Sequence, residues 1–471
     1  MSMTDASKGV SANSPKGIRS QLKESRHEMN SHIHNIFLGT TMLLALCGSV
    51  VTQAADSNDS IWSRDKLSGD WGGLRSDLGE RGVDIDIRFN QYYQDVTEGG
   101  VQENGEYAGK LDYIVNVDGE KLGLWIGLFL NLHAEYQYGD TILPDAGALA
   151  FNNTSLLYPT PGDTATEVTG WSVTQGLYQK GDTAVALTAG KIHVVDLLNQ
   201  AWPFLEMGKN GFMNYNVNLP VSPLARYIQL SHLGTALIVL HKTDIKAAFA
   251  VLDTHNSSDN TGFPKLGDNG LTAIGVYRFF FDVKDMPGRL TFVASTSTGE
   301  YTTLEKTVFH VPVKGPLGRR NLIFNVPGLV EESKRNPWTA MAYYDQVVWQ
   351  ADVTGKRNVR FVAGGALADQ NPSWARWQYT GQLVATGLFD SRPRDKIGIG
   401  GYYIGATDHV KSLSRDSILL PDLGDYSGLE IFYSAELTPA IHLTGDIQIT
   451  DDFEVDNDTA IIPGVRLSME F

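Results

Sequence analysis

The last eight residues of the chain, Gly464-Val465-Arg466-Leu467-Ser468-Met469-Glu470-Phe471, guide the interpretation of the whole sequence. Apolar and polar residues alternate in this stretch. Because successive side chains of a β-strand point to opposite faces, the valine, leucine, methionine and phenylalanine would share one face. The arginine, serine and glutamate would share the other. An edge strand of a soluble sheet gives the same pattern, so the pattern defines a fold only if it recurs.

The same alternation recurs along the chain. It is found in segments that begin near Val83, Leu124, Trp377, Leu429 and Ile441. In a soluble sandwich the apolar face of such strands forms the core. In an outer-membrane barrel the apolar face contacts lipid and the polar face lines a water-filled lumen. Alternation alone does not separate these two folds, but the lengths of the connections do.

Short and long connections alternate between the segments that are expected to be strands. The short ones lie near residues 118–121, 180–182, 241–244, 284–288, 354–356, 391–395 and 438–439. The long ones lie near residues 97–109, 139–170, 193–225, 254–270, 299–337, 369–374, 408–425 and 451–458. Fifteen connections join sixteen strands, which predicts a closed antiparallel transmembrane β-barrel with short periplasmic turns. The fourth and sixth strands, near 171–180 and 226–240, have the weakest patterns, so fourteen or eighteen strands stay open.

Residues 1–54 have the features of a cleaved signal peptide. Lys16, Arg19, Lys23 and Arg26 precede an apolar run at 36–51, and small residues follow up to Ala54. Met29 is an alternative start. The single cysteine, Cys47, follows a leucine instead of the small residue that lipidation requires. We therefore expect export through the inner membrane, assembly by the barrel-assembly machinery, and residence among the lipids of a Gram-negative outer membrane.

Charge and hydropathy exclude several classes of protein. The net charge of −16 argues against a nucleic-acid partner. No apolar run after the N-terminal region is long enough for a helical membrane span. Residues 55–82 place Trp62, Leu67, Trp71, Leu74 and Leu78 at helical spacing. We expect a periplasmic helical segment or a partial plug there, with a flexible leader as the alternative, and the barrel itself over residues 83–471.

Both ends of the chain resemble the carbohydrate-selective porins of the OprB family. At the start, Ser68-Gly69-Asp70-Trp71-Gly72-Gly73-Leu74-Arg75-Ser76-Asp77-Leu78 through Gly82-Val83 is similar to that family. Near the end, the similar stretches are Glu430-Ile431-Phe432-Tyr433, Leu437-Thr438-Pro439, Asp446-Ile447-Gln448 and Gly464-Val465-Arg466-Leu467 before Phe471. The resemblance implies a sixteen-stranded barrel that passes mono- and disaccharides through a selective constriction. The segment at 214–226 does not follow the family pattern as closely.

A sugar path needs aromatic faces for the sugar rings and charged or amide groups for the hydroxyls. By strand parity, or by position in the third long loop near 193–225, the expected pore-lining residues are Asp86, Arg88, Glu135, Trp202, Phe204, Tyr215, Arg226, Arg360, Arg376, Glu430, Asp446 and Arg466. For each residue alone, pairing with a neighbour or packing of the loop is the competing interpretation. For the group, opposed charges predict a transverse field at a constriction.

Other functions have less support in the sequence. It contains neither a Gly-x-Ser-x-Gly elbow nor a His-Glu-x-x-His helix, so we expect no enzyme, no catalytic residue, no metal site and no cofactor. A general, non-selective diffusion porin or an ion porin would share every barrel feature. A non-transport adhesin would need binding determinants in the long loops at 139–170 and 299–337. A homo-oligomer is compatible with the sequence.

Overall fold

The computed structural model describes residues 60–471, apart from 148, 150, 160–163, 304–307, 316–317, 326–332, 352–353 and 416–421. Side chains are described for the same residues except those between 304 and 332 and those between 413 and 421. The predicted signal peptide lies outside the described residues. No helix in the described part of the chain is long and apolar enough to cross a membrane.

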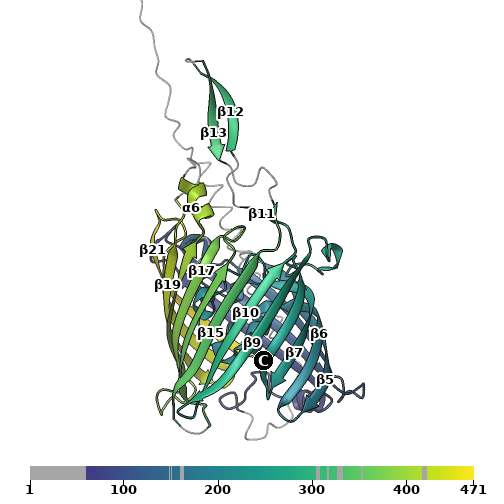
Figure 1. Cartoon of the computed structure of the whole chain (residues 1–471). Helices are drawn as coiled ribbons and strands as arrows, with labels where there is room; N and C mark the ends of the chain where they lie inside the picture. The colour runs from purple at the N-terminus through teal and green to yellow at the C-terminus, as the bar shows by residue number, and fades with distance from the viewer. Residues whose placement is uncertain are drawn as a thin grey trace, which may run out of the picture. The chain divides into compact units, whose positions relative to one another are not determined.

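Sixteen antiparallel strands close into a barrel (Figure 1). They are β1 (Val83–Asp95), β3 (Gly105–Asp118), β4 (Leu128–Gly139), β5 (Ala165–Lys180), β6 (Thr183–His193), β7 (Ser231–His241), β8 (Asp244–Asp253), β9 (Leu271–Val283), β10 (Met286–Ser297), β15 (Trp338–Gln350), β16 (Asn358–Ala368), β17 (Ala375–Thr386), β18 (Lys396–Ala406), β19 (Tyr426–Thr438), β20 (Ile441–Thr450) and β21 (Asp458–Glu470). Each pairs with the next, and β21 pairs with β1 from Arg88 opposite Glu470 to Gln94 opposite Gly464. The predicted closed barrel of sixteen strands is therefore confirmed.

The connections alternate between a short-turn end and a long-loop end, and the α6 and β11 labels in Figure 1 mark the long-loop end. The fourth and sixth strands, which had the weakest patterns, are β5 and β7. Several boundaries were wrong: β3, β5 and β7 begin at residues 105, 165 and 231 instead of near 110, 171 and 226. The largest difference is the first short connection, which spans residues 119–127, with Leu124 and Ile126 exposed in it instead of starting a strand. Their alternation with neighbouring residues continues the pattern of β4, so the strand start could not be recognised from periodicity.

Several short helices and strands lie in the connections between the barrel strands. They are β2 (Glu98–Gly100), α3 (Leu143–Ala146), η2 (Ser155–Leu157), η4 (Phe263–Lys265), β11 (Tyr301–Thr302), β12 (Val308–Gly315), β13 (Gly318–Asn325), β14 (Ser333–Lys334) and α6 (Asp408–Arg415). β2 adds to β21, whereas β11–β14 and β12–β13 form separate two-stranded sheets.

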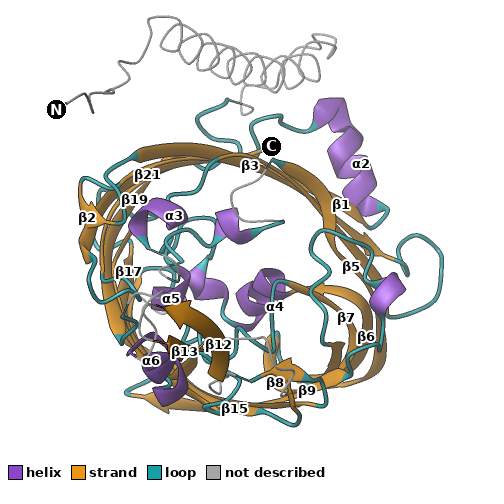
Figure 2. Ribbon diagram, turned by 90° about the horizontal axis from the view of Figure 1, so that it is seen from above, coloured by secondary structure: helices purple, strands orange, loops and turns teal. Residues whose placement is uncertain are grey.

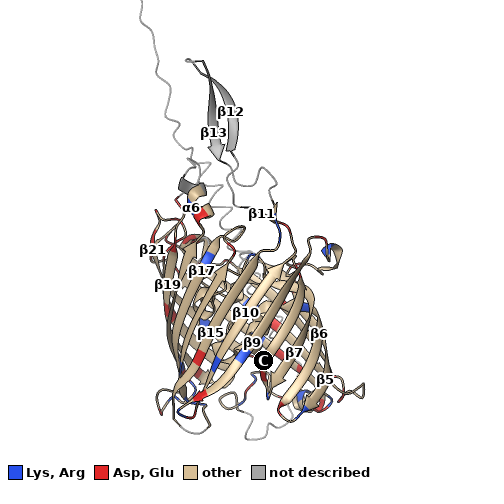
Figure 3. Cartoon of the chain, viewed as in Figure 1, with Lys and Arg blue, Asp and Glu red and all other residues tan. Residues whose placement is uncertain are grey.

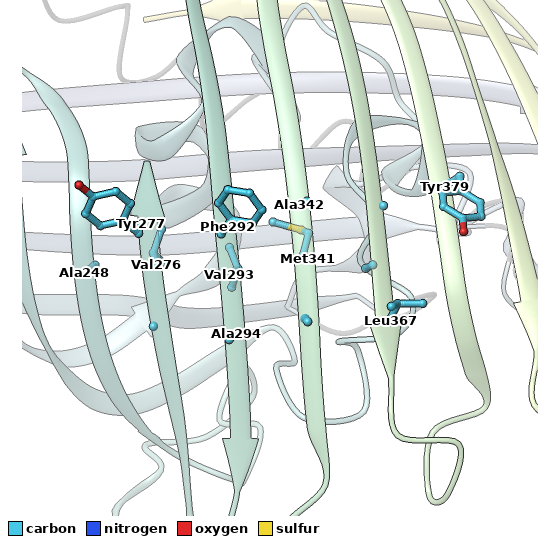
Figure 4. Close-up of a pocket in the computed structure, with 14 residues that line it drawn as sticks. Ala248, Val276, Tyr277, Phe292, Val293, Ala294, Met341, Ala342, Leu367 and Tyr379 are labelled. Carbon is cyan, nitrogen blue, oxygen red and sulfur yellow. The ribbon is translucent and has the colours of Figure 1, made fainter. Parts of the chain in front are cut away.

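The outward face of the barrel is apolar. Phe249, Tyr277, Phe292 and Tyr379 are about half exposed there. Most of the strand ribbons between the two ends are tan in Figure 3, which marks residues other than Lys, Arg, Asp and Glu. Aromatic and β-branched residues favour strands and also supply a surface that lipid can cover. Small residues between Tyr277 and Tyr379 leave a shallow depression in this surface (Figure 4).

The first described residues bind the seam where the barrel closes. They contain η1 (Trp71–Gly73) and α2 (Leu74–Glu80). The Arg75 guanidinium donates to the Phe471 carbonyl at 2.8 Å, and Lys66 Nζ lies 2.6 Å from Asp86. In the view along the barrel, α2 lies beside the ring of strands (Figure 2). The helical segment thus contacts both the first and the last strand.

The connection between β6 and β7, residues 194–230, lies inside the barrel, and we call it the inner loop. It contains α4 (Val194–Ala201), η3 (Pro203–Leu205) and α5 (Tyr215–Asn218). Figure 2 shows α4 and α5 within the ring of strands. The inner loop therefore decides how much of the lumen is left for a solute.

Candidate functional site

One side of the lumen is lined by apolar residues that pack against the inner loop. Trp202, Leu205, Leu219 and Leu224 of the inner loop are buried against β8, β9, β10, β15 and β16. Many inward residues of these strands are also apolar, among them Leu252, Ile274, Val293, Met341 and Val362. Because apolar residues dominate that side, we call it the apolar sector. A polar solute would find few hydrogen-bond partners there.

Buried polar residues of the wall hold the backbone of the inner loop. Both oxygens of Glu430 accept backbone N–H groups, from Met213 at 2.7 Å and from Asn214 at 2.8 Å. Arg466 donates to the Gly211 carbonyl at 2.9 Å. A loop lacks regular backbone pairing, and unpaired buried backbone groups are costly, so such partners are needed inside a barrel.

Further partners come from other strands of the wall. The Gln378 side chain accepts from the Ser222 N–H at 2.8 Å and donates to the Asn216 carbonyl at 3.0 Å. The Tyr343 hydroxyl donates to the Asn218 carbonyl at 2.8 Å. Residues from β15, β17, β19 and β21 thus fix the loop at four points along its length.

One half-buried edge of the inner loop carries charges that pair with charges of the wall. Lys209 Nζ lies 2.8 Å from Glu470, which also binds Arg88 at 3.0 Å. Lys396 Nζ lies 2.8 Å from Glu206. We call Arg88, Asp196, Glu206, Lys209, Lys396 and Glu470 the charged edge. Positive and negative groups alternate along it, so that local fields are strong while the sum of charge is small.

An aromatic ring lies next to the charged edge. Phe204 is half-buried, and the guanidinium of Arg360 lies 4.5 Å from its ring centre. Arg360 is paired with the buried Asp345 of the neighbouring strand. A phenyl face beside donors and acceptors is the combination that carbohydrate recognition needs.

The inner-loop carboxylates stay ionised at neutral pH. Burial raises the pKa of Glu206, but the facing Lys396 and Lys209 outweigh burial and hold that pKa below its ordinary value. Burial acts in the same direction on Asp196, whereas His193 and His133 bring its pKa to about 2. The acceptors of the edge are therefore charged under physiological conditions.

Beneath Asp196 lies a buried ionic cluster. His133 Nδ1 is 2.6 Å from Asp196 and its Nε2 is 3.0 Å from Asp112, while Lys110 lies 2.5 Å from Glu135. Two sets of three residues, His133 with His193 and Asp196, and His133 with Asp112 and Glu135, each place their ligand atoms within 4.8 Å of one another. These are the groups that could hold a divalent cation. The hydrogen bonds and ion pairs among these residues and Lys110 also connect β3, β4 and β6 to α4.

The structure places ten of the twelve predicted residues in three environments within the barrel. Asp86, Arg88, Phe204 and Arg360 are partly accessible in the lumen. Trp202 and Tyr215 lie in or against the apolar sector. Glu135, Glu430, Asp446 and Arg466 face inward, as strand parity predicts, but are buried. They line the loop and its supports instead of an open path, because the inner loop covers them.

Two predicted residues are exposed and contact elements of the long-loop end. Arg376, at a register shift at the start of β17, is half exposed and faces Asp408 of α6 at 3.8 Å. Arg226 is exposed and lies 5.9 Å from the ring of Tyr301. The parity argument failed for Arg376 because a bulge reverses the face on which a side chain emerges.

Sequence reasoning missed Asp196, Glu206, Lys209 and Lys396. The first three belong to the inner loop, where side-chain direction has no two-residue period that could be read from sequence. Lys396 lies at the start of β18, next to the predicted turn at 391–395. The presence of three charged residues in an otherwise apolar loop segment was the available signal.

Comparison with known proteins agrees with this geometry. Residues 102–471 match the family described as "Carbohydrate-selective porin, OprB family". A structure of Pseudomonas putida OprB at high pH is similar, with a TM-score of 0.70 and 18% identity over 88% of this chain and 100% of that one. A low-pH structure of the same protein has a TM-score of 0.51 and 15% identity, over 87% and 99% of the two chains. A search of curated proteins finds no match. The chain belongs to the carbohydrate-selective porins of the OprB family.

Proposed function

We propose that sugars cross the barrel along the charged edge and the face of Phe204. The observation that carries this proposal is the alternation of donors and acceptors from Lys209 and Glu470 to Lys396 and Glu206. A neutral sugar offers hydroxyls that both donate and accept, so it can exchange water for either kind of group. An ion, by contrast, would be repelled along this path by the side chains that carry its own sign of charge.

The ion pairs make weak, repeated binding the expected mode. Each charged group already has a partner, so a hydroxyl competes with an existing contact and gains little net free energy. Conduction requires that a solute bind well enough to enter and weakly enough to leave. Phe204 would add stacking against the apolar face of the sugar ring, and Arg360 on its other side would keep the ring in place.

Liposome swelling tests this proposal. Proteoliposomes with the full-length mature protein are diluted into isotonic glucose or maltose, and the initial rates are compared with those in arabinitol and with those of an unrelated porin of similar size. We expect faster uptake of the two sugars. Phe204→Ala should reduce the maltose rate severalfold, because one stacked ring contributes about 1 kcal/mol. Phe263→Ala, an exposed residue of the loop at 254–270, is the matched control.

Equal uptake of all solutes would contradict the proposed selectivity. In that result the protein would be a general diffusion porin. Retention of the wild-type maltose rate in Phe204→Ala would instead leave selectivity intact and move the path away from this ring.

We also propose the cellular setting that goes with this function. The family and the barrel place the protein in an outer membrane. We infer that residues 1–54 are removed after export, that the barrel-assembly machinery inserts the chain, and that the short-turn end with α2 faces the periplasm. N-terminal sequencing of protein from the outer-membrane fraction tests the cleavage. A mature chain that starts well before Ala55 would overturn it, and cross-linking in native membranes would detect a homo-oligomer.

A further inference from the structure

A cavity of about 470 Å³ lies within the apolar sector. Strands β6 to β10 and β15 form one wall, and the inner loop forms the other. The lining is almost entirely aliphatic or aromatic, with Leu198, Trp202, Leu224, Ile238, Ile274 and Met341 as examples. This volume falls within the range of about 300–1,000 Å³ that is usual for small-molecule sites.

The inward residues of the strands account for the apolar lining. In β8 the inward residues Ala248, Ala250 and Leu252 face the cavity, while the outward Phe249 is half exposed on the opposite face. Both faces of this strand are therefore apolar, unlike those of a strand that borders a water-filled lumen. A sugar would find few partners for its hydroxyls here, so the cavity is separate from the proposed sugar path.

One cation lies in this apolar lining. Arg278 of β9 is 1% exposed, and its Nε donates to Thr291 at 2.9 Å. Neither Nη1 nor Nη2 has a hydrogen-bond partner among the described residues. The carboxylates that act on Arg278 through space, Asp345 and Asp244, are paired with Arg360 and Arg289.

A second unpaired donor lies beside the first. The guanidinium of Arg278 is 5.2 Å from the ring centre of Trp202, whose Nε1 also has no acceptor among the described residues. Both residues line the cavity. Unpaired buried donors cost free energy, and a buried charge without a partner costs several kcal/mol.

The cavity is elongated, and its one charged group lies near one end. Along β8 its lining runs from Ile245 to Leu252, a distance of roughly 23 Å at the rise of a strand. Arg278 lies near the Ile245 end. At the other end, the lining residue Gln229 is exposed, so this end reaches solvent at the long loops.

From these features we propose that the cavity binds an amphiphile with a carboxylate head and a hydrocarbon body. The carboxylate would accept two hydrogen bonds from the Arg278 fork, a geometry that suits this pair of groups. The indole N–H of Trp202 supplies a further donor. The hydrocarbon body fills the aliphatic part between the inner loop and β8. The ligand is thus a free fatty acid or another compound with a carboxylate head and a hydrocarbon chain.

Equilibrium binding of dodecanoate to the full-length mature protein in lipid nanodiscs tests the site. Dodecan-1-ol, which has the same chain without the charge, is the matched ligand. Wild-type protein should bind dodecanoate saturably, with one site per chain, above the background of empty nanodiscs. Arg278→Met should weaken dodecanoate binding about 10- to 100-fold and leave dodecan-1-ol unchanged, because charge-assisted hydrogen bonds contribute about 1.5–3 kcal/mol. Arg335→Met, which removes an exposed loop arginine paired with Glu300, should bind like wild type.

A second variant tests the cavity independently of the charge. Ala250→Phe fills the lining and should abolish binding of both ligands. Correct folding of each variant is checked by the heat-dependent gel mobility of the barrel, and glucose swelling should be unchanged in Arg278→Met. Absence of saturable binding to wild type would overturn the proposal. Equal dodecanoate affinity in Arg278→Met and wild type would overturn the role of the guanidinium.

Discussion

The two sides of the lumen show how one loop can serve opposite purposes. Against β8 to β10 the inner loop presents Leu219, Leu224 and Trp202 to apolar strand faces. Against β1 and β21 it presents Lys209 to charged ones. Apolar packing holds the loop in place without direction, whereas ion pairs and hydrogen bonds fix its register and keep the remaining passage wet. Stability and permeation are thereby assigned to different sides of one barrel.

The largest effect is expected in the apolar sector. Leu219 is completely buried there, so Leu219→Ala should lower the free energy of unfolding by about 2–5 kcal/mol, since it removes contacts and leaves a cavity. Urea unfolding in lipid vesicles measures the change. Leu266→Ala, in an exposed part of the loop at 254–270, should change it by less than about 0.5 kcal/mol. Equal effects of the two would mean that the packing of the inner loop does not support the barrel.

A somewhat smaller effect is expected where the wall holds the loop backbone. Glu430→Ala leaves the N–H groups of Met213 and Asn214 without partners, at a cost of about 2–3 kcal/mol. Because the loop edge would then move, single-channel conductance should rise and fluctuate. Glu300→Ala, in the exposed pair with Arg335, is the control. A steady, wild-type conductance in Glu430→Ala would show that the apolar sector alone positions the loop.

Acid should weaken the charged side selectively. Asp196 has a pKa of about 2 in the folded protein and about 3.9 in an unfolded chain. A lowered pKa stabilises the fold fully above the unfolded value, and this contribution is lost as pH falls from about 4 through 2. It amounts to at most about 2 kcal/mol because Asp196 is partly exposed. Urea midpoints of wild type and Asp196→Asn should therefore differ at pH 6 and converge toward pH 2. A constant difference would contradict the assignment.

The smallest effect is expected outside both sides of the lumen. Arg376 lies 3.8 Å from Asp408 in an exposed pair, and such pairs contribute about 0–1 kcal/mol. Arg376→Ala should leave conductance and maltose swelling within error of wild type, whereas Lys209→Ala on the charged edge should alter both. A clear change in Arg376→Ala would return this residue to the solute path that strand parity first suggested.

The sequence by itself determined the barrel. The alternation of apolar and polar residues in β21 and the other strands, together with the alternation of short and long connections, predicted that β21 closes the barrel against β1. The number of these connections predicted the number of strands. These features are local, because the two-residue period of a strand fixes which face each side chain takes. The same period correctly directed Arg88, Arg360, Glu430 and Arg466 inward. It could not place Arg376, where a bulge interrupts it.

Only the tertiary structure decided which inward residues meet a solute. Glu430 and Arg466 have the same parity as Arg88, yet the inner loop buries them and leaves Arg88 accessible. The loop has no period, and its path depends on contacts with strands that are distant in sequence, such as Gln378 and Tyr343. The inward faces of β8 and β9 are mostly apolar, and whether they line a path or a packed side depends on what covers them. Burial is a property of the assembled lumen, and no single segment contains it.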